Sequence, residues 1–287
     1  MDHVRKPSWL KIDIGANPRY AATKEIVESH HLHTICHSGL CPNRNECWGH
    51  GTATFLIGGN ICTRCCKFCH TPTGKPLPLD PEEPTNVAES IRLMKLDHAV
   101  VTSVDRDDLP DLGATHWVKT IQEIKRLNPT TTFEVLIPDF KGRAELIRQV
   151  IEAKPDIISH NMETVRRLTP EVRSVARYDT SLKVIRQVAE SGIATKSGIM
   201  VGLGETPEEV EEAMDDLLTA GCRILTIGQY LQPTRKHYPV HAYISPAQFE
   251  KYRDIGIQKG FKAVESAPLV RSSYHAEKHI CFAGGKH

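Results

Sequence analysis

The chain has 287 residues, enough for one or two domains of the usual size of about 150 residues. Hydrophobic residues make up 40% and charged residues 25% of it, which is typical of a folded globular protein and not of a disordered one. Its 36 basic and 35 acidic side chains leave a net charge of +1. No overall basic field therefore exists to hold nucleic acid or an anionic membrane.

The sequence indicates a reducing compartment. No apolar run approaches the roughly 18 residues of a transmembrane helix, and the charged start MDHVRKPSWLKIDIG lacks the apolar core of a signal peptide. We therefore expect a cytoplasmic protein with no membrane partner. Nine cysteines in such a chain indicate metal binding rather than disulfides. Seven of the nine fall between residues 36 and 69.

From about residue 52, short β-branched or apolar runs alternate with stretches of helical pattern. Residues 1–50 show no clean period, and we expect little regular structure there. The expected strands are 53–57, 99–103, 132–136, 157–159, 195–201 and 224–227. The expected helices lie near 86–96, 115–127, 142–153, 180–191, 207–219 and 246–259. Two helix starts carry capping-box signals: Thr206 with Glu209 three residues on, and Ser245 with Gln248.

Strands that alternate with helices predict an α/β fold with a parallel sheet. Six βα units are too few for a full eight-fold barrel, so we expect a partial (β/α)6 TIM-like barrel with N- and C-terminal extensions. A doubly wound sheet is the competing architecture, and periodicity alone does not separate the two. In both, the reactive site lies at the carboxyl ends of the strands.

The run CTRCCKFC, residues 62–69, follows the first expected strand. Read as C-x3-C-x2-C, it uses Cys62, Cys66 and Cys69, hereafter the downstream triad. Read as two adjacent C-x2-C pairs, it also uses Cys65 and would suit a zinc ion with four thiolates. The side chains of the adjacent Cys65 and Cys66 point in different directions, which would strain a tetrahedral site.

Three cysteines on a [4Fe–4S] cluster leave one iron free to bind a small molecule. The spacing C-x3-C-x-Φ-C, with Phe68 before the last cysteine, resembles the signature of the radical S-adenosylmethionine (SAM) superfamily. The resemblance implies a cluster whose unique iron binds SAM and whose electron cleaves it to a 5′-deoxyadenosyl radical. The protein positions and shields that chemistry.

A second group, spaced C-x4-C-x5-C, consists of Cys36, Cys41 and Cys47, hereafter the upstream triad. Alone it could be a loop with free thiols; beside the downstream triad it favours a second cluster. The two triads, with the segment RSSY at 271–274, resemble the lipoyl synthase family. Further segments that resemble this family are 102–109, 159–164, 195–206, 226–233 and 271–276. The match runs from about residue 7 to residue 276.

The resemblance implies a sulfurtransferase that inserts two sulfur atoms at C6 and C8 of a protein-bound octanoyl-lysine. Both carbons are unactivated, so a radical has to remove their hydrogens. The implied cofactors are two [4Fe–4S] clusters and SAM, with the sulfur taken from the auxiliary cluster. The implied partners are octanoylated lipoyl carrier domains (E2 subunits of 2-oxoacid dehydrogenases and the glycine cleavage H protein), an electron donor such as flavodoxin or ferredoxin, and an iron–sulfur carrier.

The resemblance also divides the chain and assigns its ligands. It implies an N-terminal extension, 1–50, with the auxiliary-cluster cysteines; a radical SAM partial barrel, 51–240; and a C-terminal helix and extension, 241–287, with the RSSY segment. The family's serine ligand to the auxiliary cluster falls by position on Ser273, with Ser272 as the fallback. A serine oxygen is an unusual partner for iron, and we hypothesise that it is lost easily during sulfur transfer. Alternatively, the two serines only turn the chain.

Candidate SAM contacts follow the expected strands. Asn161 and Glu163 are placed to hydrogen-bond a ribose or an amino acid, or alternatively are polar residues at a helix start. Ser103 follows the second strand in the same way. Lys196 or Arg106 could pair with the methionine carboxylate.

The pattern Gly198-x3-Gly202-x2-Glu205 resembles a superfamily motif in which glycine lets the backbone approach adenine. An ordinary strand-to-helix turn would read the same.

Two other functions compete at this point. A second two-cluster radical SAM sulfur transferase, such as a methylthiotransferase acting on tRNA, would be expected to carry a basic RNA-binding extension, which the near-neutral charge argues against. A zinc-stabilised binding module would use the same cysteines without any reaction.

Overall fold

The computed structural model describes residues 6–11, 18–30 and 32–282 of this chain, and they form an α/β protein built on one eight-stranded sheet. The strands are β1 His33–Thr34, β2 Thr54–Ile57, β3 His98–Ser103, β4 Thr132–Leu136, β5 Ile157–Ser159, β6 Ala194–Val201, β7 Ile224–Gln229 and β8 Ala263–Ser266. Strands β2 to β8 are parallel, and β1 runs antiparallel to β2.

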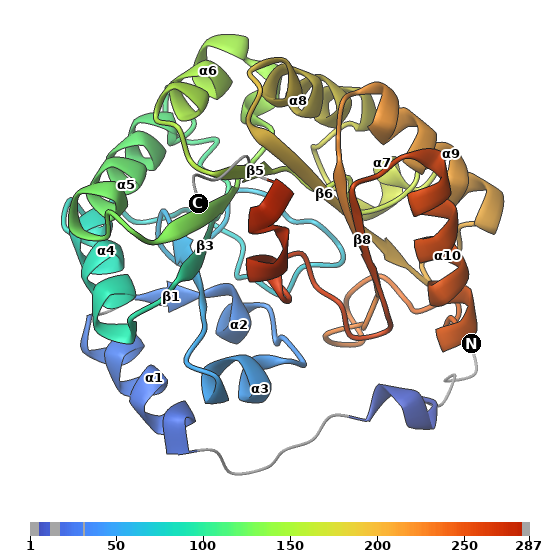
Figure 1. Ribbon diagram of the computed structural model, residues 1–287, viewed down its shortest axis with the longest axis horizontal. Helices are drawn as coiled ribbons and strands as arrows, with labels where there is room; N and C mark the ends of the chain where they lie inside the picture. Colours follow the sequence, from blue (N-terminus) through green and yellow to red (C-terminus); the bar gives the residue numbers. More distant parts are fainter. Residues whose placement is uncertain (1–5, 12–17, 31, 283–287) are drawn as a thin grey trace.

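The sheet curls into an open barrel with helices around its outside (Figure 1). The strand order equals the sequence order. A doubly wound sheet reverses its strand order at a switch point, so the partial barrel is confirmed and the competing architecture is wrong. Within the described residues no pairing joins β8 to β1, and the barrel stays open on that side.

Ten α-helices and three 3-10 helices are found in the described residues. They are α1 Pro18–Ser29, α2 Ile35–Ser38, α3 Arg44–Gly49, α4 Glu83–Met94, α5 Ala114–Leu127, α6 Ala144–Glu152, α7 Thr169–Val172, α8 Tyr178–Glu190, α9 Pro207–Thr219, α10 Pro246–Lys259, η1 Ser8–Leu10, η2 Phe140–Gly142 and η3 Ala276–Phe282. The outer helices pack on the sheet through one apolar face. In α5 this face carries Ala114, Trp117, Ile121 and Ile124, all buried at helical spacing.

All six expected strands are confirmed, as β2 to β7, and the six expected helices are confirmed within three residues at each end. Parallel strands covered on both faces are continuous apolar runs, which made them visible in the sequence. Two strands went unpredicted. β1 has two residues, too few to show a period. In β8 only one residue, Val264, is buried, so no apolar run marks the strand.

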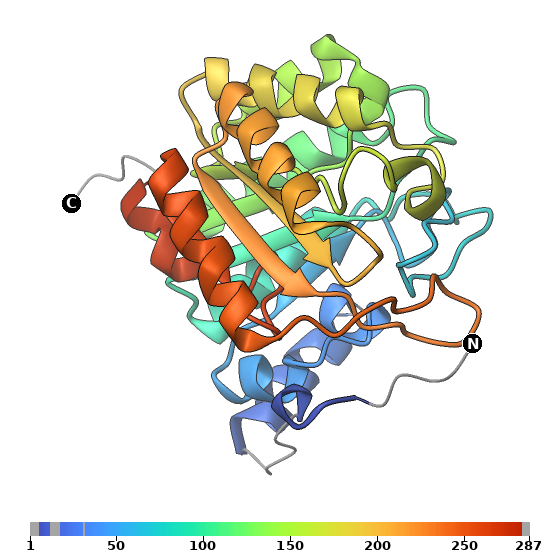
Figure 2. The same cartoon turned by 90° about the vertical axis from the view of Figure 1, so that its right-hand side faces the viewer.

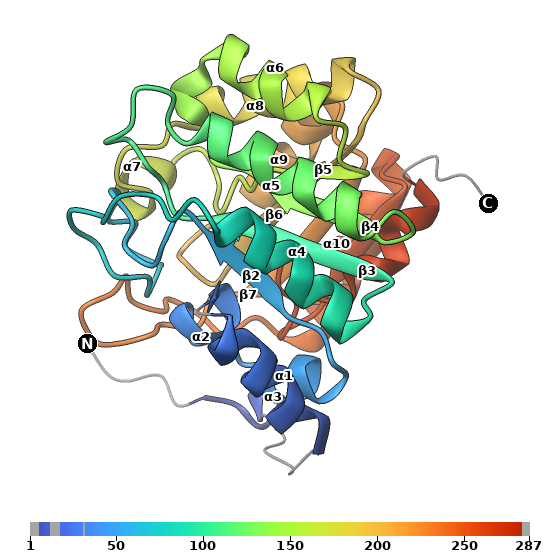
Figure 3. The same ribbon diagram turned by 90° about the vertical axis from the view of Figure 1, so that its left-hand side faces the viewer.

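The expectation of little regular structure in residues 1–50 is wrong, because α1, β1, α2 and α3 lie there. The sequence of α1 has no periodic apolar pattern, and contacts with other parts of the chain stabilise this helix. The rings of Tyr20 and Trp48 lie 5.2 Å apart, and Thr23 Oγ1 donates to the Trp48 carbonyl at 3.0 Å. Figure 3 shows α1, α2 and α3 together at one side of the barrel, next to β2.

The carboxyl ends of the parallel strands and the loops that follow them gather at one end of the barrel, whereas η3 lies at the opposite end (Figure 2). None of the described helices is long and apolar enough to cross a membrane.

The capping box predicted at Thr206 is complete: its hydroxyl accepts from Glu209 N–H at 3.3 Å, and the Glu209 carboxylate accepts from Thr206 N–H at 2.8 Å. At Ser245 the structure shows the hydroxyl half of the predicted box, with Gln248 N–H as donor. We expect Thr206→Ala to lower the free energy of unfolding by about 1 kcal/mol, measured by chemical denaturation. Thr206→Ser keeps the hydroxyl and should restore most of it; equal losses in both variants would contradict this role of the cap.

Candidate functional site

The downstream triad lies on a loop that leaves β2 at its carboxyl end through Gly58 and Gly59, both with positive φ. The loop closes on itself: Cys62 N–H donates to the Pro72 carbonyl at 2.8 Å, and Gly74 N–H donates to the Cys62 carbonyl at 3.0 Å. A closed loop of this kind fixes the cysteine backbone without a helix or strand. The triad therefore lies at the barrel end where the expected reactive site belongs.

Two backbone N–H groups donate to the first sulfur of this triad. Cys62 Sγ accepts from the N–H of Asp105 at 3.3 Å and from that of Arg64 at 3.4 Å. Burial, with the nearby Asp105, raises the pKa of the Cys62 thiol to about 12. Burial also raises the pKa of Cys66 and of Cys69. These thiols therefore stay protonated at neutral pH unless a bound metal supplies the compensating positive charge.

Arg64, between the first two cysteines of the triad, anchors the loop to the barrel. Its side chain is 3% exposed and donates to Asp107 at 2.8 and 3.0 Å and to Asp139 at 2.8 Å. Asp105 lies 3.3 Å from Nε. Three carboxylates that follow β3 and β4 thus hold one guanidinium of the cysteine loop. Sequence reasoning missed this role, because the three partners lie 41 to 75 residues away.

The donor set of the downstream triad fits an iron–sulfur cluster. Cys65 is exposed, whereas the three triad thiols are partly buried, so the loop presents three sulfurs and not four. Among the described residues, no three side chains of His, Cys, Asp or Glu are gathered closely enough to hold one metal ion. Ligands of a [4Fe–4S] cluster bind separate irons, so they stand farther apart than the ligands of a single ion.

The upstream triad lines a cavity of about 340 Å³ together with Ser273. Cys36 lies on α2, Cys47 on α3 and Cys41 between them. Burial raises the pKa of all three thiols, neighbouring thiols add to the rise at Cys41 and Cys47, and the pKa of Cys47 is raised to about 12. Ser272 is not among the residues that line the cavity. The structure thus brings together the four side chains expected at the auxiliary cluster, and the donor set fits the group.

The RSSY segment reaches this cavity through contacts between the two ends of the chain. Asn43 Nδ2 donates to the Leu269 carbonyl at 2.7 Å, and the Tyr274 hydroxyl donates to Glu46 Oε1 at 3.0 Å. Both pairs are separated by more than 220 residues in sequence. Ser273 lies between these two contacts, so the α2–α3 segment and the C-terminal segment form one site.

Asn161 and Glu163 lie at the carboxyl end of β5, as expected. Glu163 has φ +66°, a left-handed conformation that is costly for a residue with a side chain. It is held there because its N–H donates to Gly198 O at 3.0 Å and its carbonyl accepts from Met200 N–H at 2.8 Å. Asn161 Oδ1 is buried without a partner among the described residues. A buried amide oxygen without a partner indicates room for a polar ligand.

Ser103 and Gly198 belong to the same end of the barrel. Ser103 Oγ is also buried without a described partner, and it ends β3. At Gly198 a Cβ would lie 2.9 Å from Asn161 Oδ1 and 2.8 Å from Thr226 Oγ1, so the glycine keeps room for Asn161. These polar atoms fit the amino-acid or ribose part of a ligand such as SAM.

The two cations expected to pair with the methionine carboxylate have different surroundings. Lys196 is 0% exposed and its Nζ donates to Glu134 Oε2 at 2.8 Å, so its charge is already paired. Arg106 donates to Asp108 at 2.9 and 2.8 Å and to the Gly58 carbonyl at 3.1 Å. Neither cation is brought to the downstream triad by these contacts.

The glycine motif also packs against protein. A Cβ at Gly202 would clash with Gln229 and with the Ala242 carbonyl, so this glycine allows a close approach of two chain segments. Glu205 accepts from the N–H groups of Gly202 and Leu203 at 2.5 and 2.9 Å. An ordinary strand-to-helix turn, the alternative interpretation of this glycine pattern, explains these contacts.

Arg173 is a buried cation that sequence reasoning missed. Nη1 donates to Ser181 Oγ at 2.8 Å and to the Met162 carbonyl at 3.2 Å. Its charge lowers the pKa of Glu163 and of Asp105, although burial outweighs it and raises both, that of Asp105 to about 6. The bond to the Met162 carbonyl places it beside the Asn161–Glu163 segment. No motif in the sequence marks this position.

Two histidines fix the loop of the downstream triad. His70 Nδ1 donates to the Ser38 carbonyl at 3.0 Å, and Ser38 lies between Cys36 and Cys41. His237 Nε2 donates to the Cys69 carbonyl at 3.1 Å, and the two rings are 5.7 Å apart. His70 therefore links the segments of the two triads directly, and His237 holds the downstream loop to the segment after β7.

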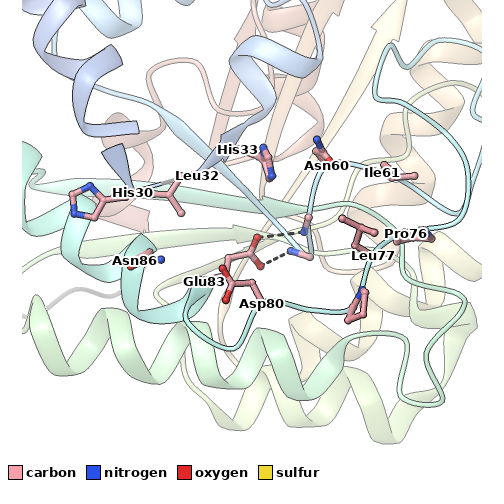
Figure 4. A pocket seen from close by; sticks show the side chains of 13 residues that line it. His30, Leu32, His33, Asn60, Ile61, Pro76, Leu77, Asp80, Glu83 and Asn86 are labelled. Atoms are coloured by element: carbon pink, nitrogen blue, oxygen red, sulfur yellow. Dashed lines mark hydrogen bonds between the residues drawn. The ribbon is translucent and has the colours of Figure 1, made fainter. Parts of the chain in front are cut away.

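Glu83 fixes the turn from which the cysteine loop starts (Figure 4). The carboxylate accepts from Gly58 N–H at 2.7 Å and from Gly59 N–H at 3.3 Å. His116 Nε2 lies 2.5 Å from Oε2. Consecutive N–H groups of left-handed residues form an anion-binding concavity, and Glu83 fills it.

The comparisons with known proteins agree with this site. The radical SAM superfamily matches residues 56–217. The chain is 76% identical to a lipoyl synthase of Phocaeicola vulgatus, over 99% of this chain and 100% of that protein. It is 75% identical to a lipoyl synthase of Bacteroides fragilis, over 97% of both chains. Streptococcus suis SuiB bound to S-adenosylmethionine has the same fold, with a TM-score of 0.59 at 11% identity, over 79% of this chain and 55% of SuiB.

We expect Glu83→Ala to lower the free energy of unfolding by about 3 kcal/mol, because it leaves buried N–H donors without an acceptor. Chemical denaturation of the metal-free protein measures this loss. The matched control is Glu82→Ala, since Glu82 is exposed and makes no side-chain cap bond. A difference between the two variants below about 0.5 kcal/mol would contradict the anchoring role of Glu83.

Proposed function

The chain belongs to the lipoyl synthase family of the radical SAM superfamily, and on this basis we propose that it inserts two sulfur atoms at C6 and C8 of an octanoyl-lysine on a carrier domain. The product is the lipoyl group, and the enzyme is a sulfurtransferase. The observation that carries the proposal is the pair of cysteine triads, with Ser273 in the cavity of the upstream one. One triad alone would suit many radical SAM reactions.

We assign a [4Fe–4S] cluster to each triad. The downstream cluster with bound SAM would supply a carbon-centred radical, and the upstream cluster, with Ser273 as its fourth ligand, would supply the sulfur. The thiols of each triad are buried or partly buried, which favours metal binding, because a bound metal offsets the cost of placing thiolates there. The N–H donors to Cys62 stabilise the same charge.

Asn161, Glu163 and Ser103 are the residues we assign to SAM. Their polar atoms lie at the carboxyl ends of β3 and β5 and have unmet hydrogen-bonding capacity or strained backbone. We add Arg173, whose guanidinium lies beside Glu163 and could pair with the methionine carboxylate. We do not assign Lys196 or Arg106 to SAM binding, because each is already paired with a carboxylate. Gly202 and Glu205 shape the loop that borders this site.

The fixed distance between the two triads is the second requirement of this reaction. A radical formed on the substrate must meet sulfur before it reacts elsewhere, so both loops have to be held around one substrate chain. The bond His70–Ser38 joins the two segments, and the bond His237–Cys69 holds the downstream loop to the segment after β7. The Arg64 network and Glu83 fix the same loop from the barrel side.

The partners follow from the reaction. They are octanoylated carrier domains, of the kind found in 2-oxoacid dehydrogenases and in glycine cleavage, a low-potential electron donor such as flavodoxin or ferredoxin, and an iron–sulfur carrier that rebuilds the consumed cluster. All nine cysteines are free, which suits a reducing, cytoplasmic site of action.

The direct test is the mass of an octanoyl-lysyl carrier peptide incubated anaerobically with iron-reconstituted protein, SAM and a strong reductant. We expect a gain of two sulfur atoms and the formation of 5′-deoxyadenosine. Deoxyadenosine with an unchanged peptide would retain the radical SAM reaction and reject the sulfur insertion.

Ser273→Cys tests the role of the serine oxygen. We expect the variant to keep its full iron content and to form deoxyadenosine, but to lose about tenfold or more of lipoyl product, because a thiolate releases iron less readily. Ser272→Ala and Cys65→Ala are matched controls, since neither residue belongs to the four-ligand set, and both should form product normally. Unchanged product formation in Ser273→Cys would contradict the assignment.

A further inference from the structure

The carboxyl end of the barrel carries a surface that is more basic than the rest of the chain. Three segments form it: residues 65–67 of the cysteine loop, residues 171–177 at the end of α7 and beyond it, and residues 234–238 on the loop after β7. They carry five basic side chains and one acidic side chain, Glu171. This excess of four positive charges contrasts with the net charge of +1 for the whole chain.

Hydrogen bonds hold the three segments together around Lys67. Its N–H donates to the Val172 carbonyl at 2.9 Å, and its carbonyl accepts from Tyr238 N–H at 2.8 Å. The Tyr238 hydroxyl donates to Glu171 Oε2 at 3.1 Å, which joins the other two segments to each other. Figures 2 and 3 show the loop after β2, α7 and the loop after β7 at the same end of the barrel. The basic surface is therefore contiguous.

The exposed cations of this surface have no acidic partner. None of them forms an ion pair with a described residue. They are Lys67, Arg177, Arg235 and Lys236, hereafter the cationic face. By contrast, the exposed Arg167 pairs with Glu209. Exposed cations without partners leave a positive potential that attracts an acidic partner.

The cationic face borders the downstream triad. Lys67 directly follows Cys66, whose Sγ lies 3.8 Å from Ser174 Oγ. His237, next to Lys236, donates from Nε2 to the Cys69 carbonyl at 3.1 Å. The rate of electron transfer falls steeply with distance. A donor on this face would therefore reach a cluster at the downstream triad by a short path through the protein.

The cationic face borders one triad and not both. No hydrogen bond between described residues joins its three segments to residues 36–47 or 271–274. The octanoyl chain has to lie where it meets both clusters, whereas an electron donor needs the downstream cluster alone. Redox encounters between proteins use small interfaces, and charge steers their association. These properties favour an electron donor over the carrier domain at this face.

We propose that the cationic face docks an acidic electron-transfer protein and is the entry point for the electron used at the downstream triad, an inference that rests on the proposed cluster there. One electron leaves the reduced donor and enters the cluster. The donor is oxidised and the cluster is reduced by one electron each, and no atom is transferred. Charge steers this association, so it weakens as salt screens the face.

The rate of 5′-deoxyadenosine formation by the reconstituted, full-length protein tests the face, because only the downstream cluster takes part in that step. The electron comes either from a limiting amount of reduced flavodoxin, an acidic protein, or from saturating dithionite. We expect the double variant Arg235→Glu with Lys236→Glu to lower the flavodoxin-driven rate at low salt about tenfold or more. Both residues are exposed, so the dithionite-driven rate and the iron content should stay within about twofold of wild type.

The matched control is Lys119→Glu with Lys183→Glu, which makes the same change in net charge at exposed sites on α5 and α8. It should leave both rates unchanged. Lys67→Gln tests the centre of the face and should lower the flavodoxin-driven rate about threefold. Added salt should slow the flavodoxin-driven reaction of the wild type and leave that of the Arg235→Glu, Lys236→Glu variant almost unaffected.

A wild-type flavodoxin-driven rate in the double variant, or an equal loss in the matched control, would overturn the proposal. So would an equal loss with dithionite, which would assign the effect to the cluster and not to docking. A raised KM for an octanoylated carrier domain in dithionite-driven reactions, with the flavodoxin-driven rate unchanged, would assign the face to the carrier instead. If the wild type forms no deoxyadenosine with dithionite, the proposed cluster itself is wrong, whichever surface the donor uses.

Discussion

The parallel direction of β2 to β8 is the constraint on which the site depends. Because parallel strands end at the same edge, the cysteine loop after β2, the carboxylates after β3 and β4, and the Asn161–Glu163 segment after β5 meet at one end of the barrel. Arg64 shows this convergence most clearly. It lies on the loop after β2, and its buried guanidinium contacts carboxylates from the loops after β3 and β4. The opening between β1 and β8 then admits the C-terminal segment and brings Ser273 to the upstream triad.

Burial sets the chemistry of both triads. Six thiols with raised pKa values would be a costly arrangement in a protein without metal, and a cluster removes that cost while folding fixes the loops that hold it. The same reasoning separates the two ends of the barrel. At the carboxyl end, polar groups are left with unmet hydrogen bonds, as at Asn161; at the amino end, Lys196 and Glu134 pair with each other.

Much of this architecture could be predicted from sequence, for physical reasons that differ between elements. β2, β3 and β7 are short, mostly apolar runs that are buried along nearly their whole length, so the fold could be predicted. Cysteines crowded between residues 36 and 69 indicate metal ligands rather than scattered core thiols, so the two triads could be recognised. α1 could not be predicted, because its sequence has no periodic pattern and contacts such as Tyr20 with Trp48 stabilise it. The pairing of Lys196 with Glu134 could not be predicted, because a residue pattern does not say which groups a buried side chain meets inside a barrel. Arg173 and Glu83 act through partners that the sequence does not mark.

Counting iron and acid-labile sulfide tests the central claim, that each triad holds its own cluster. The measurement compares the reconstituted protein with two variants, each with alanine at one whole triad. Two [4Fe–4S] clusters predict about eight irons per chain in the intact protein and about four in each variant. An intact protein with about four irons, or one triad whose removal leaves the count unchanged, would contradict the account.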